Sequence, residues 1–139
     1  MIGLRRPFLT GWLGGGLRGR IGPWGERVAA RYLRKQGLRL LERNYRARSG
    51  EIDLVLLEDG VLVFVEVKTS RVDARFPATE RIDAVKQRRL RRAAGAFLKH
   101  RCPPIDDWRF DAVVVEYRLG RWGWRRVVSV EWYPGFFQC

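Results

Sequence analysis

Apart from Glu58 and Asp59 at their junction, two adjacent apolar segments of this sequence, GEIDLVLLED and GVLVFVEVKT, contain three carboxylates and one ammonium group. They belong to Glu51, Asp53, Glu66 and Lys68. Burial penalises a charge unless the group is paired or coordinates a metal ion. Two carboxylates held together in apolar surroundings either share a proton or bind a cation. Mg²⁺ and Mn²⁺ suit such a pair, because they keep several waters and need few protein oxygens.

A β-hairpin is the element that would position these groups. Residues 51–58 and 61–68 read as two strands joined by Asp59 and Gly60, and Asp-Gly is typical of a two-residue type I′ turn. The segment VLVFVEV is apolar on both faces, which indicates a central strand covered on both sides.

Counting outward from this turn places Asp53 opposite Glu66 and Glu51 opposite Lys68, all four on one face of the sheet. Directly opposed residues have Cβ atoms about 4.5–5.5 Å apart, where like charges destabilise the pair. The alternative is a half-exposed sheet face with a chance ladder of charges, in which Glu51 and Lys68 form a simple salt bridge.

A helix is predicted from Pro23 to a C-cap at Gly37. Glu26 shares its inner stripe with Ala29 and Ala30, small residues that permit close packing against a sheet. Glu26 is therefore a third carboxylate that leans toward the pair, or an ordinary first-turn Glu favoured by the helix dipole.

A long second helix is predicted over about residues 79–100, with Thr79 as its N-cap. Helical spacing gives it one apolar stripe, formed by Ile82, Val85, Leu90, Ala93 and Phe97. Lys86 falls inside this stripe with Arg89 near it, and three further arginines point outward: Arg88, Arg91 and Arg92. An inward cation needs an anionic partner or a phosphate, unless Lys86 snorkels to solvent.

Three more segments read as strands: LRLLERNYRARSG before the hairpin, then WRFDAVVVEYR and WRRVVSVEWY after the long helix. The order αβββαββ predicts one α/β domain with a mixed β-sheet flanked by helices. We assign this domain to residues 23–139 and read residues 1–22 as a flexible, basic, Gly-rich tail.

The charge balance favours a polyanionic partner. The chain has 28 Lys and Arg against 15 Asp and Glu, a net charge of +13, and nucleic-acid-binding domains commonly have a pI above about 9. Two cysteines and one histidine show no zinc-site spacing. No apolar run reaches the roughly 18 residues of a membrane span, so we expect a cytoplasmic protein without a membrane partner.

The C-terminal segment is rich in aromatic residues, among them Trp122, Trp124, Trp132 and Tyr133. They either stack on unpaired bases or simply pack on the sheet. Phe136 and Phe137 follow and are candidates to cover a dimer surface.

The spacing of Asp53, Glu66 and Lys68 resembles the D…(D/E)-x-K core of the PD-(D/E)xK nuclease superfamily. A wider run is more specific: WGERVAARYLRKQGLRLLERNYRARSGEIDLVLLEDGVLVFVEVKTS, then AVKQRRLRRAAGAFL and RFDAVVVE. Together they resemble the YraN family of small bacterial proteins, which is similar to archaeal Holliday-junction resolvases. The resemblance covers about residues 23–117.

This resemblance implies a restriction-endonuclease-like fold of the Holliday-junction-resolvase type. It implies Asp53 and Glu66 as ligands of Mg²⁺ or Mn²⁺, Lys68 as the catalytic lysine, and Glu26 as the acidic residue of the first helix. It also implies a homodimer, since resolvases of this fold commonly act as dimers. The candidate nucleic-acid contacts are Glu51 of GEIDL, Lys86 and Gln87 of the KQ pair, and Arg89, Arg48 and Arg71.

The leading hypothesis is an Mg²⁺-dependent endonuclease that hydrolyses phosphodiester bonds in branched or otherwise structured DNA. The first alternative is a nucleic-acid-binding module that uses the nuclease scaffold without cleavage, on DNA or RNA. A second is a protein adaptor whose basic face docks an acidic partner.

Overall fold

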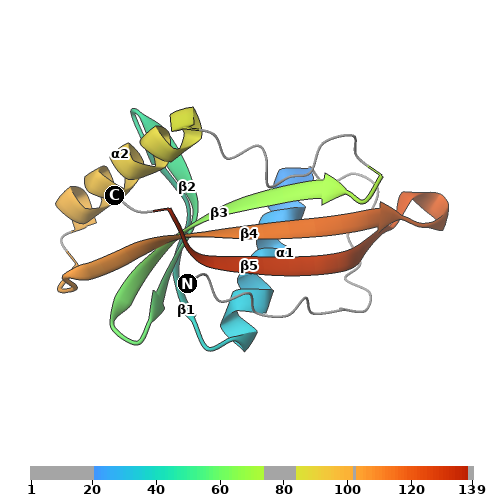
Figure 1. Cartoon of the computed structure of the whole chain (residues 1–139), viewed down its shortest axis with the longest axis horizontal. Coiled ribbons are helices and arrows are strands. Elements are labelled where there is room, and N and C mark those ends of the chain that lie inside the picture. Colours follow the sequence, from blue (N-terminus) through green and yellow to red (C-terminus); the bar gives the residue numbers. More distant parts are fainter. Residues whose placement is uncertain (1–20, 74–83, 102, 138–139) are drawn as a thin grey trace.

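The computed structural model describes residues 21–73, 84–101 and 103–137, which form a five-stranded sheet with one helix on each face (Figure 1). The elements are α1 (Ile21–Lys35), β1 (Arg39–Ala47), β2 (Gly50–Glu58), β3 (Val61–Arg71), α2 (Ala84–Arg101), β4 (Asp107–Leu119), the short 3₁₀ turn η2 (Arg121–Gly123) and β5 (Arg125–Phe137). The predicted order αβββαββ and the single mixed α/β domain are confirmed, and the architecture is consistent with a restriction-endonuclease-like fold.

The sheet keeps the order of the chain, β1-β2-β3-β4-β5. β3 and β4 run parallel, joined through α2, and the other neighbouring pairs are antiparallel. β3 is the middle strand and is buried on both faces from Leu62 to Val67. The prediction of a covered central strand is therefore confirmed.

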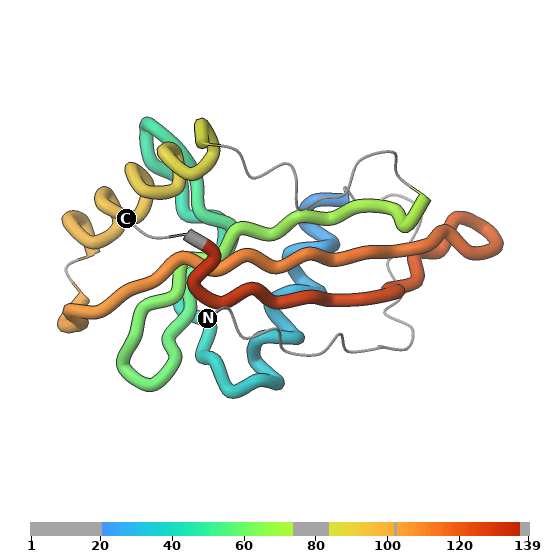
Figure 2. The backbone as a smooth tube through the Cα atoms, viewed as in Figure 1, coloured from blue at the N-terminus to red at the C-terminus, as the bar shows by residue number. Residues whose placement is uncertain are grey.

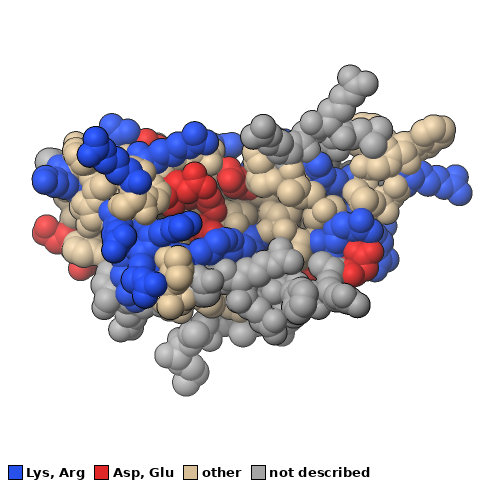
Figure 3. Space-filling view, turned by 90° about the horizontal axis from the view of Figure 1, so that it is seen from above, with Lys and Arg blue, Asp and Glu red and all other residues tan. Residues whose placement is uncertain are grey.

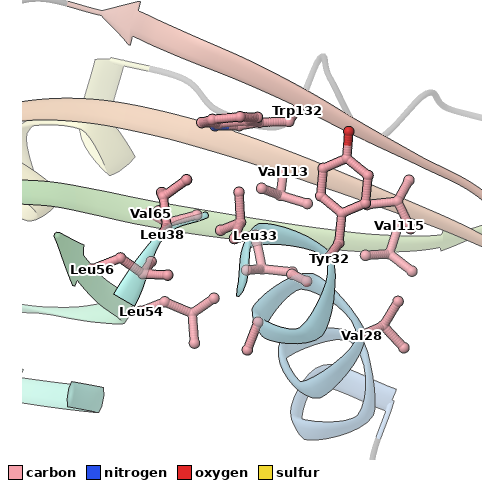
Figure 4. Packing of buried hydrophobic residues seen from close by; sticks show 14 of the residues in the cluster. Val28, Tyr32, Leu33, Leu38, Leu54, Leu56, Val65, Val113, Val115 and Trp132 are labelled. Atoms are coloured by element: carbon pink, nitrogen blue, oxygen red, sulfur yellow. The ribbon is translucent and has the colours of Figure 1, made fainter. Parts of the chain in front are cut away.

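Two apolar clusters lie on opposite faces of the sheet. Under α1, Leu33 packs with Val65, Val113 and Trp132 (Figure 4). Under α2, the residues in contact are Phe64, Leu90, Ala93, Phe97 and Phe110. Alternate residues of β3 thus serve different clusters, as the two-residue period of a strand requires.

The start of α1 corrects one expectation. α1 begins at Ile21, so residues 21 and 22 belong to the helix and not to a tail. The expected tail residues 1–20 lie outside the described residues, as do Thr79 and Ile82 at the expected start of the second helix. Burial of Leu90, Ala93 and Phe97 is confirmed.

Val85 was expected on the inner stripe of α2, and this is wrong because its side chain is exposed. Among the residues that the structure describes, the apolar packing of α2 against the sheet begins at Leu90, more than one turn beyond Val85. Ala94 is buried instead. No helix in the described parts of the chain combines the length and apolarity needed to cross a membrane.

Candidate active site at a fork in the sheet

β2 and β3 separate at the predicted carboxylate pair. The type I′ turn is confirmed, with φ of 48° at Asp59 and 81° at Gly60, and the register runs as expected from Glu58–Val61 to Leu54–Val65. It ends there. Beyond this point β2 stays with β1 beneath α2, whereas β3 continues beside β4 (Figure 2).

The carboxylate of Asp53 fills the opening of this fork. The backbone N–H of Val67 on β3 donates a hydrogen bond of 2.7 Å to Asp53 Oδ2. The expected facing of Glu51 and Lys68 is therefore wrong, because the strands have already parted. The ion pair found for Glu51 is with Arg46, at 3.8 Å.

Asp53 and Glu66 remain close together across the fork. Only 8% of Asp53 and 9% of Glu66 is exposed. Burial raises the pKa of Asp53 to about 8, and the negative charge of Glu66 adds to this rise, while the Val67 N–H opposes it. The two carboxylates thus repel each other in apolar surroundings, the situation in which a pair shares a proton or binds a cation.

Two lysines converge on Glu66 from different elements. Lys68 Nζ lies 3.0 Å from Glu66 Oε1 and is nearly buried. Lys86 Nζ, from α2, lies 3.5 Å from the same oxygen. Lys86 therefore has the anionic partner that its inward position requires, and the two ammonium groups share Glu66 Oε1.

Glu26 approaches the pair from α1. Burial raises its pKa, and the charges of Glu51 and Glu66 raise it further. Because α1 starts at Ile21, Glu26 lies beyond the first turn, and the explanation that it serves the helix dipole is wrong. Gly25 permits the approach, since a Cβ at this position would lie 1.8 Å from Thr69 Oγ1 on β3.

Asn44 was missed by the sequence reasoning. Its φ is 50°, a left-handed conformation uncommon in residues other than glycine, and it lies between the Arg43–Leu54 and Tyr45–Ile52 pairs of β1 and β2. Its side chain hydrogen-bonds Glu26 and so lowers the pKa of that carboxyl. The sequence signal was weak: Asn is one of the few residues that adopt this conformation readily.

A basic groove leads to the carboxylates. It has a volume of about 770 Å³ and lies between the β1–β2 turn and the first half of α2. Its lining includes Glu51 and Glu66 and four cationic residues: Arg46, Arg48, Lys86 and Arg89. In Figure 3, acidic side chains lie in a hollow bordered by Lys and Arg.

Gly50 permits a close approach between two elements that line this groove. A Cβ on Gly50 would lie 2.5 Å from the backbone oxygen of Arg89, so the start of β2 and the backbone of α2 are in direct contact. Among the predicted nucleic-acid contacts, Arg48, Glu51, Lys86 and Arg89 meet here. Arg46 is a further lining residue that the sequence reasoning missed.

Two predicted contacts are not brought into the groove. Arg71 ends β3 and forms an ion pair with Asp73 at 2.8 Å. Gln87 is half-buried on α2 and does not line the cavity. The helix turns Gln87 away from the groove while Lys86 and Arg89 face it.

The residues present fit a hydrated divalent cation. Within the described ranges, no three acidic, histidine or cysteine side chains gather closely enough to enclose an ion. Mg²⁺ does not require this, because it keeps several waters and is commonly held by one or two carboxylates. Asp53 and Glu66 supply two carboxylates whose mutual repulsion a cation would relieve.

Several known proteins similar to this chain carry the same family description. The sequence model of the family described as "Uncharacterised protein family UPF0102" matches residues 25–115. A UPF0102 protein of Roseiflexus castenholzii is 42% identical over 120 residues, covering 86% of this chain and 94% of the relative. One from Syntrophotalea carbinolica is 40% identical, covering 84% and 90%. One from Mycolicibacterium gilvum is 43% identical, covering 75% and 86%.

Proposed function

The chain belongs to the uncharacterised protein family UPF0102, the YraN family, and from its site we propose that it is a metal-dependent endonuclease that hydrolyses phosphodiester bonds in DNA. Branched or otherwise structured DNA is the proposed substrate. One observation carries the proposal: a buried pair of carboxylates and a nearly buried lysine meet where a basic groove ends. The hydrogen bond from Val67 requires only an acceptor oxygen at position 53, so it does not explain a second carboxylate charge beside Glu66.

Asp53 and Glu66 would hold Mg²⁺ or Mn²⁺. A bound ion of this kind polarises a phosphoryl oxygen and lowers the pKa of its water. Lys68 places a fixed positive charge 3.0 Å from Glu66 Oε1, where it stabilises the negative charge that develops on the reacting phosphate. Glu26 has a raised pKa and so suits the acceptance of a proton from the attacking water.

The groove supplies the binding part of this function. Arg46, Arg48 and Arg89 are exposed cations along its lining. Contacts from arginine to phosphate fix the register of a nucleic acid without reading its sequence. We propose that a DNA strand follows the groove toward Glu66, and that the protein acts in the cytoplasm. The homodimer implied by the resemblance stays a prediction.

A second candidate function is a nucleic-acid-binding module without cleavage, on DNA or RNA. The observation that favours it is the double pairing of Glu66 with Lys68 and Lys86. These two ammonium groups already neutralise one carboxylate of the pair, so the site has a state in which no metal is needed.

The test is cleavage of labelled four-way-junction, flap, single-stranded and duplex DNA with Mg²⁺ or Mn²⁺. We expect cutting by the wild type that chelation abolishes. Asp53→Asn should abolish cutting through loss of an anionic ligand. Lys68→Ala should retain metal binding but lose about a hundredfold or more in rate. DNA binding without cutting, unchanged in Asp53→Asn, would contradict the nuclease and favour the binding module.

A further inference from the structure

The far end of the β4–β5 hairpin carries an exposed aromatic residue in an unusual conformation. We call residues 118–126 the β4–β5 tip; it extends past the last β3–β4 pair, Arg71–Tyr117 (Figure 2). Trp122 at its turn is 81% exposed and has φ of 62°. A bulky residue with positive φ is a genuine outlier. Neither burial nor turn geometry explains a tryptophan here.

Two positive charges also face each other across the tip. Arg118 on β4 pairs directly with Arg126 on β5, and both are exposed. Like charges directly opposite across two strands destabilise the pair, so this arrangement favours an anion bound between or beside them. Arg125 is different: it is half-buried, with its guanidinium 5.6 Å from the ring of Trp24.

The two arginines lie on the same face of the sheet as Lys68. Lys68 pairs with Val114 in the parallel β3–β4 ladder. Arg118 comes four residues after Val114, and alternation along a strand returns it to that face. Tyr117 confirms the alternation, since it is buried with the α1 cluster on the opposite face.

Strand geometry gives the distance from the site to the tip. Glu66 pairs with Ala112, and the path from Ala112 to Leu119 spans seven residue steps, about 23 Å at 3.3 Å per residue. Successive phosphates of one B-form strand are about 3.4 Å apart along the axis, so this path matches about seven nucleotides.

We propose that the β4–β5 tip is a second nucleic-acid contact, in which Arg118 and Arg126 bind phosphates and Trp122 stacks on the first unpaired base beyond a duplex segment of this length, about seven nucleotides from the reacting phosphate. This rests on the proposed function for the nature of the substrate. An indole stacks on a base whose face is free, whereas bases inside a duplex cover each other. The occupant is therefore DNA with unpaired bases near a branch.

The experiment measures binding without metal, so that cleavage does not enter. Fluorescence anisotropy in EDTA would give the Kd of the full-length protein for a forked DNA and for a duplex of equal length. Trp122→Ala should weaken fork binding about fivefold to a hundredfold, the range for one stacked base, and leave duplex binding nearly unchanged. Trp122→Phe should retain most of the affinity.

Trp108→Ala is the matched control, because Trp108 is 42% exposed at the opposite end of β4; its fork affinity should equal that of the wild type. Arg118→Ala should lower the slope of log K against log salt by about one. Trp122→Asn should lose fork affinity like Trp122→Ala yet raise the thermal unfolding midpoint, because Asn before Gly123 suits positive φ. A purely structural role for Trp122 would lower that midpoint.

Equal fork affinity of Trp122→Ala and wild type would overturn the role of the tip. The same holds if fork and duplex binding fall together, or if Trp108→Ala matches Trp122→Ala. If the wild type cleaves DNA in a metal-dependent way and Trp122→Ala binds the fork as tightly as the wild type, the proposed contact at the tip is wrong and the proposed nuclease activity stands. If Trp122→Ala selectively loses fork binding but the wild type does not cut DNA, the proposed contact at the tip stands and the proposed nuclease activity is wrong.

Discussion

Replacing Asp53 with Asn should remove a pH-dependent weakness of the fold. The pKa of Asp53 is about 8 in the folded protein against an ordinary 3.8, mainly because of burial and then because of Glu66. Asn is a conservative test, since its amide oxygen can still accept the hydrogen bond from Val67. The substitution thus removes the negative charge and keeps the hydrogen bond from Val67 where β2 and β3 separate.

The direction of the change in unfolding free energy with pH follows from proton binding to Asp53. Between about pH 4 and pH 8 the folded state keeps a proton on Asp53 that the unfolded state has released. The contribution of this group to the free energy of unfolding is fully present below about pH 4 and is lost as the pH rises through about 8. At about 1.4 kcal/mol per unit, the loss from pH 5 to pH 8 is at most about 4 kcal/mol.

The assay is urea unfolding of the wild type and Asp53→Asn at several pH values, in EDTA and with saturating Mg²⁺. In EDTA, the wild type should lose up to about 4 kcal/mol relative to the variant between pH 5 and pH 8. Mg²⁺ should restore the wild type at pH 8, because a ligand that binds only the folded state stabilises it. The variant should not respond.

Two outcomes would refute this reasoning. A difference between wild type and Asp53→Asn that stays constant with pH would mean that Asp53 has no raised pKa. A variant that is less stable at every pH without metal would mean that the charge of Asp53 is a structural ion-pair partner.

Two further predictions concern the groove and the core. Arg89→Ala should weaken DNA binding and lower the slope of log K against log salt by about one, whereas Arg34→Ala, an exposed arginine on α1, should not; equal slopes would exclude Arg89 as a phosphate contact. Asp111→Ala should cost about 3 kcal/mol or more of unfolding free energy in urea titration. This carboxylate is fully buried and accepts hydrogen bonds from Arg109, Trp132 and the backbone N–H of Gly135; a loss below about 1 kcal/mol would contradict its assigned role in the core.

The hairpin shows what local sequence can and cannot predict. Asp59-Gly60 determines the turn, and the turn determines the register as far as Leu54–Val65. The end of the pairing depends on distant parts of the chain, because β3 continues along β4 while β2 follows β1. The alternation of side chains along β2 and β3 is the same before and after the point where the two strands separate, so the sequence pattern does not reveal that point. The carboxylate pair was therefore predictable, and the partners of Glu51 and Lys68 were not.

The helices show the same division. Spacing predicted that Glu26 and Lys86 face the sheet, and both have Glu66 within electrostatic reach. It did not predict that Gly25 and Gly50 bring α1 and α2 into close contact with the strands. These contacts involve residues far apart in the sequence. The sequence shows the small residues but not their partners.

The fork explains why the charges lie where burial should exclude them. When two strands part, a backbone N–H loses its partner, and an unpaired buried N–H is costly. Asp53 satisfies the N–H of Val67 and so introduces a carboxylate beside Glu66 in the interior. The same parting leaves Glu66 in contact with the groove between β2 and α2. The break in the sheet thus creates both the electrostatic strain and the route by which a ligand relieves it, which is why stability and metal binding should change together when Asp53 is altered.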